Sequence, residues 1–154
     1  YRYCISRAPI LNPFDAGLAW HRPLAWSVDI LEQAVHLFRG THDFTAFAAL
    51  RGNEPRPIPE GYFRRTITQT QVAQTGEHVF ITFTGTGFLY KMVRLMTGAA
   101  HEAARGKITL EELARLINAP LPDAKSPFCA PPDGLTLMRV HYPEETFGDK
   151  KKIN

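Results

Sequence analysis

The sequence predicts an α/β (α+β) domain in which helices pack on one side of a largely antiparallel β-sheet. Apolar and polar residues alternate with the period of a strand in three segments, residues 1–6, 62–73 and 78–84. Apolar residues recur at helical spacing in three others, residues 28–38, 88–104 and 110–117. A short turn joins the second and third strands, which makes them antiparallel neighbours. This order of elements is typical of the α+β class.

The first third of the chain is expected to form a strand, a connection and a helix. Residues 1–6 form the strand, and a connection punctuated by prolines follows. Ser27 caps the helix, and Gly40 lies where that helix should end. The apolar face of the helix consists of Val28, Leu31, Ala34, Val35 and Phe38. We expect residues 41–61 to be irregular.

The middle of the chain predicts a hairpin, with strands at 62–73 and 78–84 and a turn at Gln74-Thr75-Gly76-Glu77. In the second strand, Val79, Ile81 and Phe83 should share one face of the sheet, and Phe80, Thr82 and Thr84 the other.

A helix over residues 88–104 should follow the hairpin. Its buried stripe is expected to hold Phe88, Met92, Leu95, Met96 and Ala99, and its opposite side Lys91, Arg94, Gly98 and His101. Thr109-Leu110-Glu111-Glu112 is a capping box that opens a third helix. Residues 135–142 predict the last strand.

Length, net charge and cysteine content restrict the class of protein to which the chain can belong. A chain of 154 residues forms one domain, with residues 144–154 expected to be a flexible tail. A net charge of +3 is compatible with a nucleic-acid partner without requiring one. Cys4 and Cys129 lack metal-type spacing and indicate a reduced, cytoplasmic protein. We find neither a signal peptide nor an apolar run of the roughly 18 residues that a membrane span needs.

Arg94 is the first candidate for a functional residue. Its neighbours are Met92, Val93, Leu95 and Met96, so the helix is apolar nearly all round. A surface arginine is the simpler interpretation from spacing alone. If Arg94 enters a pocket instead, its planar guanidinium, whose N–H donors form a fork, needs a carboxylate or phosphate that can accept two parallel hydrogen bonds. Tyr1 and Tyr3 share one side of the first strand and could stack on an unpaired base, although core tyrosines are common.

Other patterns carry weaker signals. Adjacent side chains such as His42 and Asp43 seldom face each other, so a turn or cap is the better interpretation for Asp43. The Gly85-Thr86-Gly87 turn lacks the remaining elements of a nucleotide fingerprint, and its glycines more simply allow a tight turn. Arg64 and Arg65 could contact a nucleic-acid backbone or could be ordinary edge-strand arginines. No cluster has metal-ligand spacing.

Five motifs in order resemble the C-terminal half of the tRNA pseudouridine synthase A family. They are Tyr1-Arg2-Tyr3-Cys4-Ile5, Gly40-Thr41-His42-Asp43-Phe44-Thr45-Ala46-Phe47, Arg65-Thr66-Ile67, Gly87-Phe88-Leu89-Tyr90-Lys91-Met92-Val93-Arg94 and Ala130-Pro131-Pro132-Asp133-Gly134-Leu135. The resemblance extends from residue 1 to about residue 143. It implies a pseudouridine synthase catalytic-type domain.

The resemblance also implies a function. Members are cofactor-free isomerases that convert uridine to pseudouridine in the anticodon stem-loop of tRNA, after the base has left the stack. By this resemblance Arg94 pairs with the catalytic aspartate, Tyr1 packs against the target base, and Leu135 lines the same pocket. Lys91, Arg64 and Arg65 complete the expected substrate-binding set. The partners implied are tRNA, the N-terminal domain of the same protein and a second copy.

One departure from the family pattern is serious. The family's catalytic aspartate lies in an upstream Gly-Arg-Thr-Asp motif that these residues do not contain. The chain opens on Tyr1 in mid-strand without an initiator Met, so we expect it to be cut from a longer protein and to be inactive alone. Two alternatives stay open: a non-catalytic RNA-binding or dimerisation module derived from the fold, and a metabolic enzyme that binds phosphate at Gly85–Gly87.

Overall fold

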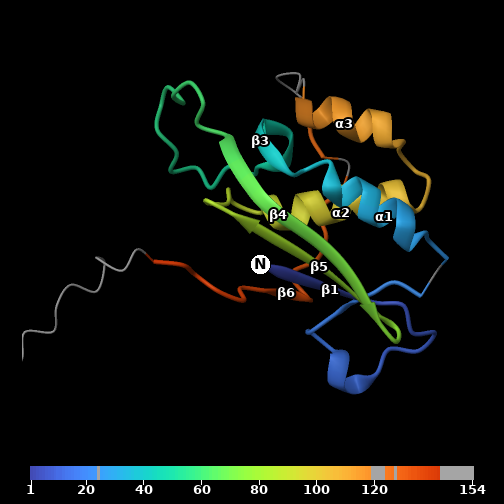
Figure 1. Ribbon diagram of the computed structural model, residues 1–154. Coiled ribbons are helices and arrows are strands. Elements are labelled where there is room, and N and C mark those ends of the chain that lie inside the picture. The colour runs from blue at the N-terminus through green and yellow to red at the C-terminus, as the bar shows by residue number, and fades with distance from the viewer. Residues whose placement is uncertain (24, 119–123, 127, 143–154) are drawn as a thin grey trace, which may run out of the picture.

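The strands form one sheet, and the three α-helices lie on the same side of it (Figure 1). This computed structural model describes residues 1–23, 25–118, 124–126 and 128–142. The α+β class predicted from the sequence is confirmed. The tail predicted at residues 144–154 lies outside the described residues. Within the described ranges, none of the helices has the length and apolar character that crossing a membrane would take.

The sheet has the order β2-β1-β5-β4-β3, and β6 also pairs with β1. Its strands are β1 (Arg2–Ser6), β2 (Trp20–His21), β3 (Gly40–Asp43), β4 (Arg64–Thr75), β5 (His78–Gly85) and β6 (Leu135–Thr136). Every pairing is antiparallel except that of β1 with β2. β1 therefore has β5 on one side and, on the other, β2 and β6 in succession.

The hairpin lies where it was predicted, with shifted ends. Thr75 still pairs with His78, so the turn consists of Gly76 and Glu77 alone. Gly76 has a positive φ of 55°, the conformation that such two-residue turns require. The predicted alternation in β5 is confirmed, because its three residues Val79, Ile81 and Phe83 are fully buried.

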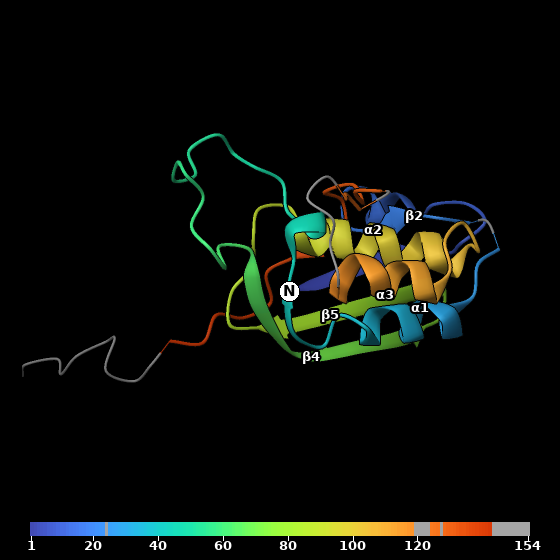
Figure 2. The ribbon, with the colours of Figure 1, turned by 90° about the horizontal axis from the view of Figure 1, so that it is seen from above.

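Both predicted helix caps are present. The Ser27 Oγ accepts a hydrogen bond from the Ile30 amide at 3.2 Å and starts α1 (Val28–His36). At α3 (Leu110–Asn118) the capping box is reciprocal: the Glu112 amide donates to the Thr109 Oγ1 at 3.1 Å, and the Thr109 amide donates to the Glu112 carboxylate at 2.7 Å. Viewed from above, α1, α2 and α3 lie together over the strands (Figure 2).

The second helix differs from its prediction in two respects. α2 covers Met92–Ala104 rather than residues 88–104, and Lys91, directly before it, adopts a left-handed φ of 59°. The side predicted to be polar is also largely enclosed, since Gly98 and His101 are buried. The reason is that α2 contacts α1, α3 and the 3₁₀ turn η2 (Thr45–Phe47), so it has neighbours on several sides rather than on one.

Three further predictions about strands need correction. Residues 40–43 form β3 against β4, where an irregular segment was expected. β2 was not predicted, because two residues in a proline-rich connection carry no periodicity. The strand predicted at 135–142 pairs only at Leu135 and Thr136. The 3₁₀ turn η1 (Pro13–Asp15) lies in the connection before β2.

Candidate active site

A cavity of about 300 Å³ lies where the start of α2 meets the beginnings of β1 and β6. Four of the six predicted site residues line it, namely Tyr1, Lys91, Arg94 and Leu135. They come from three elements that are far apart in the sequence. The fold therefore brings Tyr1 and Leu135, which the sequence analysis linked to Arg94 only by family resemblance, into one cavity with Arg94 and Lys91.

Arg94 is half-buried and held from one side. Its Nε donates a 2.7 Å hydrogen bond to the Ala130 carbonyl oxygen, while its own carbonyl accepts the Ala130 amide at 3.1 Å. Within the described residues, its two terminal nitrogens have no hydrogen-bond or ion-pair partner. With Nε occupied, the end of the fork is the part free to bind a planar anion with two parallel hydrogen bonds.

The loop that holds Arg94 depends on a glycine one turn along the helix. A Cβ on Gly98 would lie 2.3 Å from the Phe128 carbonyl oxygen and 3.0 Å from the Ala130 nitrogen. Only glycine allows the loop backbone to lie this close to α2. The Tyr3 hydroxyl fixes the other side of the loop by donating to the Pro131 carbonyl at 2.7 Å, and burial raises the pKa of this phenol, which keeps it protonated.

Tyr1 is placed by both its backbone and its ring. Its nitrogen donates to the Phe83 carbonyl at 3.0 Å, and its carbonyl accepts the Phe83 amide at 2.9 Å. The ring packs edge-on against Phe88, with centroids 5.0 Å apart. An aromatic face is thereby presented to the same cavity as the Arg94 guanidinium.

The sequence analysis did not identify Arg51 or Tyr90 as site residues, although both line this cavity. The Arg51 guanidinium lies over the Tyr90 ring at 4.5 Å, and the Lys91 ammonium lies 5.4 Å from the same ring. Together with Arg94, these residues place three cations around the cavity, and no described carboxylate lines it. Arg51 belongs to an irregular segment with no periodicity, so only the folded structure connects it to the site.

The remaining two predicted residues do not line this cavity. Arg65 lines a neighbouring cavity with Arg51 and Tyr90, and its Nη1 donates to the Tyr62 carbonyl at 2.9 Å. Arg64, the residue before it and the first of β4, lies in a different hollow beside Asp43 and is exposed. If both arginines contact substrate, they do so away from the Arg94 cavity.

The weaker candidates have structural roles. The Asp43 carboxylate accepts the Thr45 amide at 2.8 Å, as a turn residue does. A Cβ on Gly85 would lie 2.7 Å from the Thr66 carbonyl, so close strand approach explains this glycine. Burial raises the pKa of the Cys4 thiol to about 11, which leaves it protonated and unreactive. In the described part of the chain, no three His, Cys, Asp or Glu side chains are grouped so as to hold a metal ion.

Comparison with known proteins supports the resemblance. The family model described as tRNA pseudouridine synthase matches residues 34–143. The chain is 99% identical over its whole length to a tRNA pseudouridine synthase A of Akkermansia muciniphila, of which it covers 58%. It is 35% identical to the tRNA pseudouridine synthase A of Methylacidiphilum infernorum, covering 94% of this chain and 54% of that protein. A Brevibacillus brevis protein of the same name is 34% identical, with 92% and 55% covered.

The match covers most of the described residues, including Arg94, Lys91 and Leu135. The chain spans between about half and three fifths of the length of each of these three relatives. The chain belongs to the tRNA pseudouridine synthase family.

Proposed function

We propose that this chain is the C-terminal domain of a tRNA pseudouridine synthase, which isomerises uridine to pseudouridine in tRNA. One observation carries the proposal. In the described part of the chain, nothing pairs with the two terminal guanidinium nitrogens of Arg94, which borders a cavity lined by Tyr1 and two further cations but by no described carboxylate. A cation held in this way needs an anionic partner, and the family resemblance supplies one, the catalytic aspartate of an N-terminal domain.

In the proposed reaction the target uridine leaves its stack and enters the cavity. The aspartate attacks the nucleotide, the bond between C1′ and N1 breaks, and the uracil rotates. A bond then forms between C1′ and C5 of the uracil, which releases the aspartate. The C5 hydrogen leaves as a proton, and N1, which has lost its bond to C1′, takes up a proton. The step is an isomerisation, so it consumes no oxidant, reductant or cofactor.

Each cavity residue has a separate task in this scheme. The Arg94 fork orients the aspartate through two hydrogen bonds and keeps it ionised. The Tyr1 ring packs against the uracil, and Leu135 closes the cavity with an apolar surface. Lys91 and Arg51 balance phosphate charge on the flipped-out nucleotide.

We propose further features on the family resemblance alone. The target uridines lie in the anticodon stem-loop, the full-length protein acts in the cytoplasm as a homodimer, and the 154-residue chain is inactive by itself because it lacks the aspartate. The two cysteines are free, as suits a reducing compartment.

The test is tritium release from tRNA labelled at uracil C5, measured for the full-length protein beside this chain. We expect release by the full-length protein only. Release by neither, with tRNA binding retained, would instead identify a non-catalytic RNA-binding module. Release by the 154-residue chain would show that the nucleophile lies within it and would overturn the assignment of roles.

A further inference from the structure

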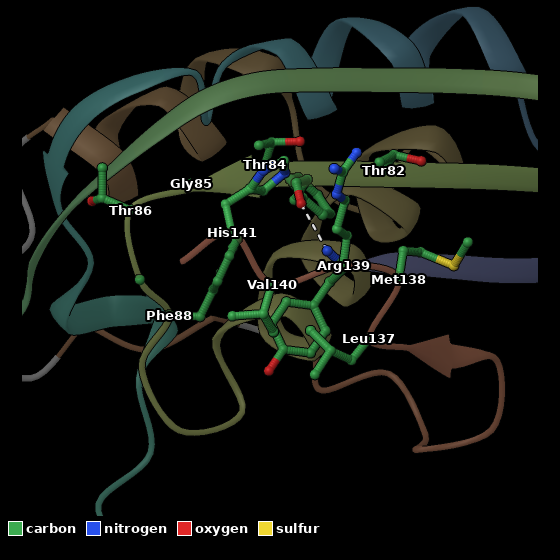
Figure 3. Close-up of a pocket in the computed structure, with 13 residues that line it drawn as sticks. Thr82, Thr84, Gly85, Thr86, Phe88, Leu137, Met138, Arg139, Val140 and His141 are labelled. Atoms are coloured by element: carbon green, nitrogen blue, oxygen red, sulfur yellow. Dashed lines mark hydrogen bonds between the residues drawn. The ribbon is translucent and has the colours of Figure 1, made fainter. Parts of the chain in front are cut away.

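Two further cavities adjoin the candidate active site. One, of about 490 Å³, lies between the end of β5 and the segment 137–141 (Figure 3). Its basic side chains, Arg139 and His141, both extend from that one segment. The other, of about 330 Å³, is lined by arginines from two different segments of the chain, so an anion could be held between them. We call this cavity of about 330 Å³ the side cavity.

The side cavity and the active-site cavity share one wall. The side cavity lies between the loop 48–54, residues 62–65 at the start of β4, and the turn 88–90 before α2. The Ala49 amide donates to the Tyr90 carbonyl at 3.1 Å, which ties the loop to the turn. Four residues line both cavities, namely Arg51, Phe88, Leu89 and Tyr90. A molecule in the active-site cavity is therefore separated from the side cavity by these side chains alone.

The side cavity has the size and the aromatic surface that a nucleotide needs. Its volume of about 330 Å³ is close to the volume, about 300 Å³, of the cavity proposed to receive the flipped-out uridine. Tyr62 and Phe63 line it from the β4 side, with ring centroids 5.1 Å apart, and Tyr90 lines it from the α2 side. Proteins bind unstacked bases chiefly by packing them against aromatic rings. In the described part of the chain the Tyr62 hydroxyl has no hydrogen-bond partner, so the contribution of Tyr62 is its ring.

The charges of the side cavity favour a phosphate beside the base. The Arg65 Nη1 donates to two backbone carbonyls, at 2.6 and 2.9 Å, while its Nε and Nη2 have no partner within the described ranges. In the same ranges the Arg51 guanidinium has only its contact with an aromatic ring. One carboxylate, that of Glu54, also lines the cavity, but both of its oxygens accept backbone amides of the loop. Two guanidinium groups thus outnumber one carboxylate, and both have donors left for a phosphate.

We propose that the side cavity binds the nucleotide next to the target uridine in the RNA chain, with its base against Tyr62 and Phe63 and its phosphates beside Arg51 and Arg65. The inference rests on the proposed function, because it takes the active-site cavity as the place of the flipped-out uridine. A nucleotide that leaves its stack displaces the nucleotide bonded to it, and the shared wall puts that neighbour within reach of the side cavity. Stacking and phosphate contacts do not distinguish the four bases, so the side cavity holds the RNA chain without selecting its sequence.

A double-mutant cycle between Tyr62 and the RNA base tests this contact. Tyr62 lines the side cavity and not the active-site cavity, so Tyr62→Leu leaves the latter intact. We expect Tyr62→Leu in the full-length protein to weaken tRNA binding about 5- to 150-fold, the effect of losing one stacked base. Tyr62→Phe is the matched control, because it keeps the ring and should bind tRNA nearly as tightly as the unchanged protein.

The RNA side of the cycle uses tRNA in which an abasic nucleotide replaces one base of the anticodon stem-loop at a time. The target uridine is first located by mapping pseudouridine in tRNA treated with the full-length protein. An abasic nucleotide on one side of that uridine should weaken binding by the unchanged protein, and Tyr62→Leu should then cause no further loss. A variant with a damaged fold would instead lose the same factor of affinity for intact and abasic tRNA.

The outcomes separate this inference from the proposed function. If Tyr62→Leu weakens binding by the same factor for every abasic tRNA, no base packs on this ring and the inference is overturned. Coupling confined to a base remote from the target uridine would overturn it as well. Affinity is read without turnover, so tritium release without coupling would reject the nucleotide site and leave the synthase standing. Coupling without tritium release would keep the side cavity as a base-binding site and reject the synthase.

Photochemical cross-linking gives a second test, free of amino-acid substitutions. We expect 5-iodouridine, placed at the nucleotide beside the target uridine, to cross-link under ultraviolet light to Tyr62 or Phe63, as identified by peptide mass spectrometry. The matched control places 5-iodouridine several nucleotides away and should give at least about tenfold less of this product, because only a base packed on the ring reacts with it. Cross-links from both flanking positions that fall elsewhere on the protein, with none at residues 62–65, would overturn the inference.

Discussion

The two ends of α2 carry polar residues on what the sequence predicts to be one side of the helix, yet their surroundings differ. At the first end, Arg94 borders an open cavity with two guanidinium nitrogens unpaired among the described residues. At the second end, His101 is fully buried, with its ring centroid 4.5 Å from Trp20 and 5.4 Å from Trp26. The Arg22 Nε lies 3.4 Å from the His101 Nε2.

The difference lies in where the cations find partners. At the His101 end, Arg22 lies over the Trp20 ring at 5.2 Å, and Arg105 donates to the Glu102 carboxylate at 3.0 Å. Both cations are thus matched within the domain. Among the described residues, the Arg94 side chain has only the Ala130 carbonyl as a partner and keeps its other hydrogen-bond donors. The contrast separates an end whose cations are paired within the fold from an end where a cation beside a cavity keeps unused hydrogen-bond donors.

Arg94→Lys should give the largest effect. An ammonium cannot form the two parallel hydrogen bonds of the fork, so we expect tritium release by the full-length protein to fall about 100- to 1000-fold. Arg105→Lys, at the other end of α2, is the matched control and should retain near-normal activity. The contrast fails if both variants lose activity equally, or if Arg94→Lys stays active with an unchanged melting temperature.

The sequence predicts those features of the fold that depend on neighbouring residues, but not those that depend on contacts between distant residues. The caps at Ser27 and Thr109 and the hairpin depend on neighbouring residues, so local patterns predict them. The start of α2 depends on distant contacts, since Phe88 packs against Tyr1 instead of continuing the helix. The spacing of apolar residues likewise does not predict that Gly98 is buried, because the loop that covers it lies thirty residues further along the chain.

The residues of the candidate site also fall into those that the sequence predicts and those that only the folded structure reveals. Family motifs identify Tyr1, Arg94 and Leu135, and the fold brings them into one cavity. Arg64 was suggested only by its charge beside Arg65, and because adjacent residues of a strand face opposite sides, it lies at a different hollow. Arg51 lacks any sequence signal, because its position depends on the Tyr90 ring.

Gly98→Ala tests whether the close packing of the loop at Phe128–Ala130 on α2 stabilises the fold. Gly98 lies on α2 between Arg94 and His101, where this loop contacts the helix. The added Cβ would meet backbone atoms that have no flexible side chain to move. We expect the free energy of unfolding of the full-length protein to fall by about 1–3 kcal/mol, measured by urea denaturation. Gly87→Ala is the control, because its Cβ would have ordinary contacts at 3.8 Å or more. Equal stability of the two variants would show that the loop does not constrain α2.

The His101 end should make stability depend on pH. Burial, followed by Arg22 and then Arg105, lowers the pKa of His101 from 6.5 to about 3, although Glu102 lies 3.7 Å away. The unfolded chain therefore binds the proton first, and stability falls as the pH drops from about 6.5 toward 3. We expect a loss of about 2 kcal/mol between pH 7.5 and pH 5, which His101→Phe should largely remove. An unchanged pH profile in the variant would place the acid sensitivity elsewhere.

Arg51→Ala should give the smallest effect and one confined to RNA binding. Arg51 lies exposed beside the cavity, so its loss should leave the fold intact and remove about one phosphate contact. We expect tRNA affinity to weaken several-fold and the slope of log K against log salt to become shallower by about 0.7–0.9. Arg7→Ala removes an equal charge near the His101 end, where Arg7 lies over Trp26 at 4.8 Å, and should leave the slope unchanged. Equal slopes for the two variants would mean that tRNA affinity depends only on the net charge of the protein. The result would contradict the assignment of the Arg94 end of α2 as the end that faces RNA.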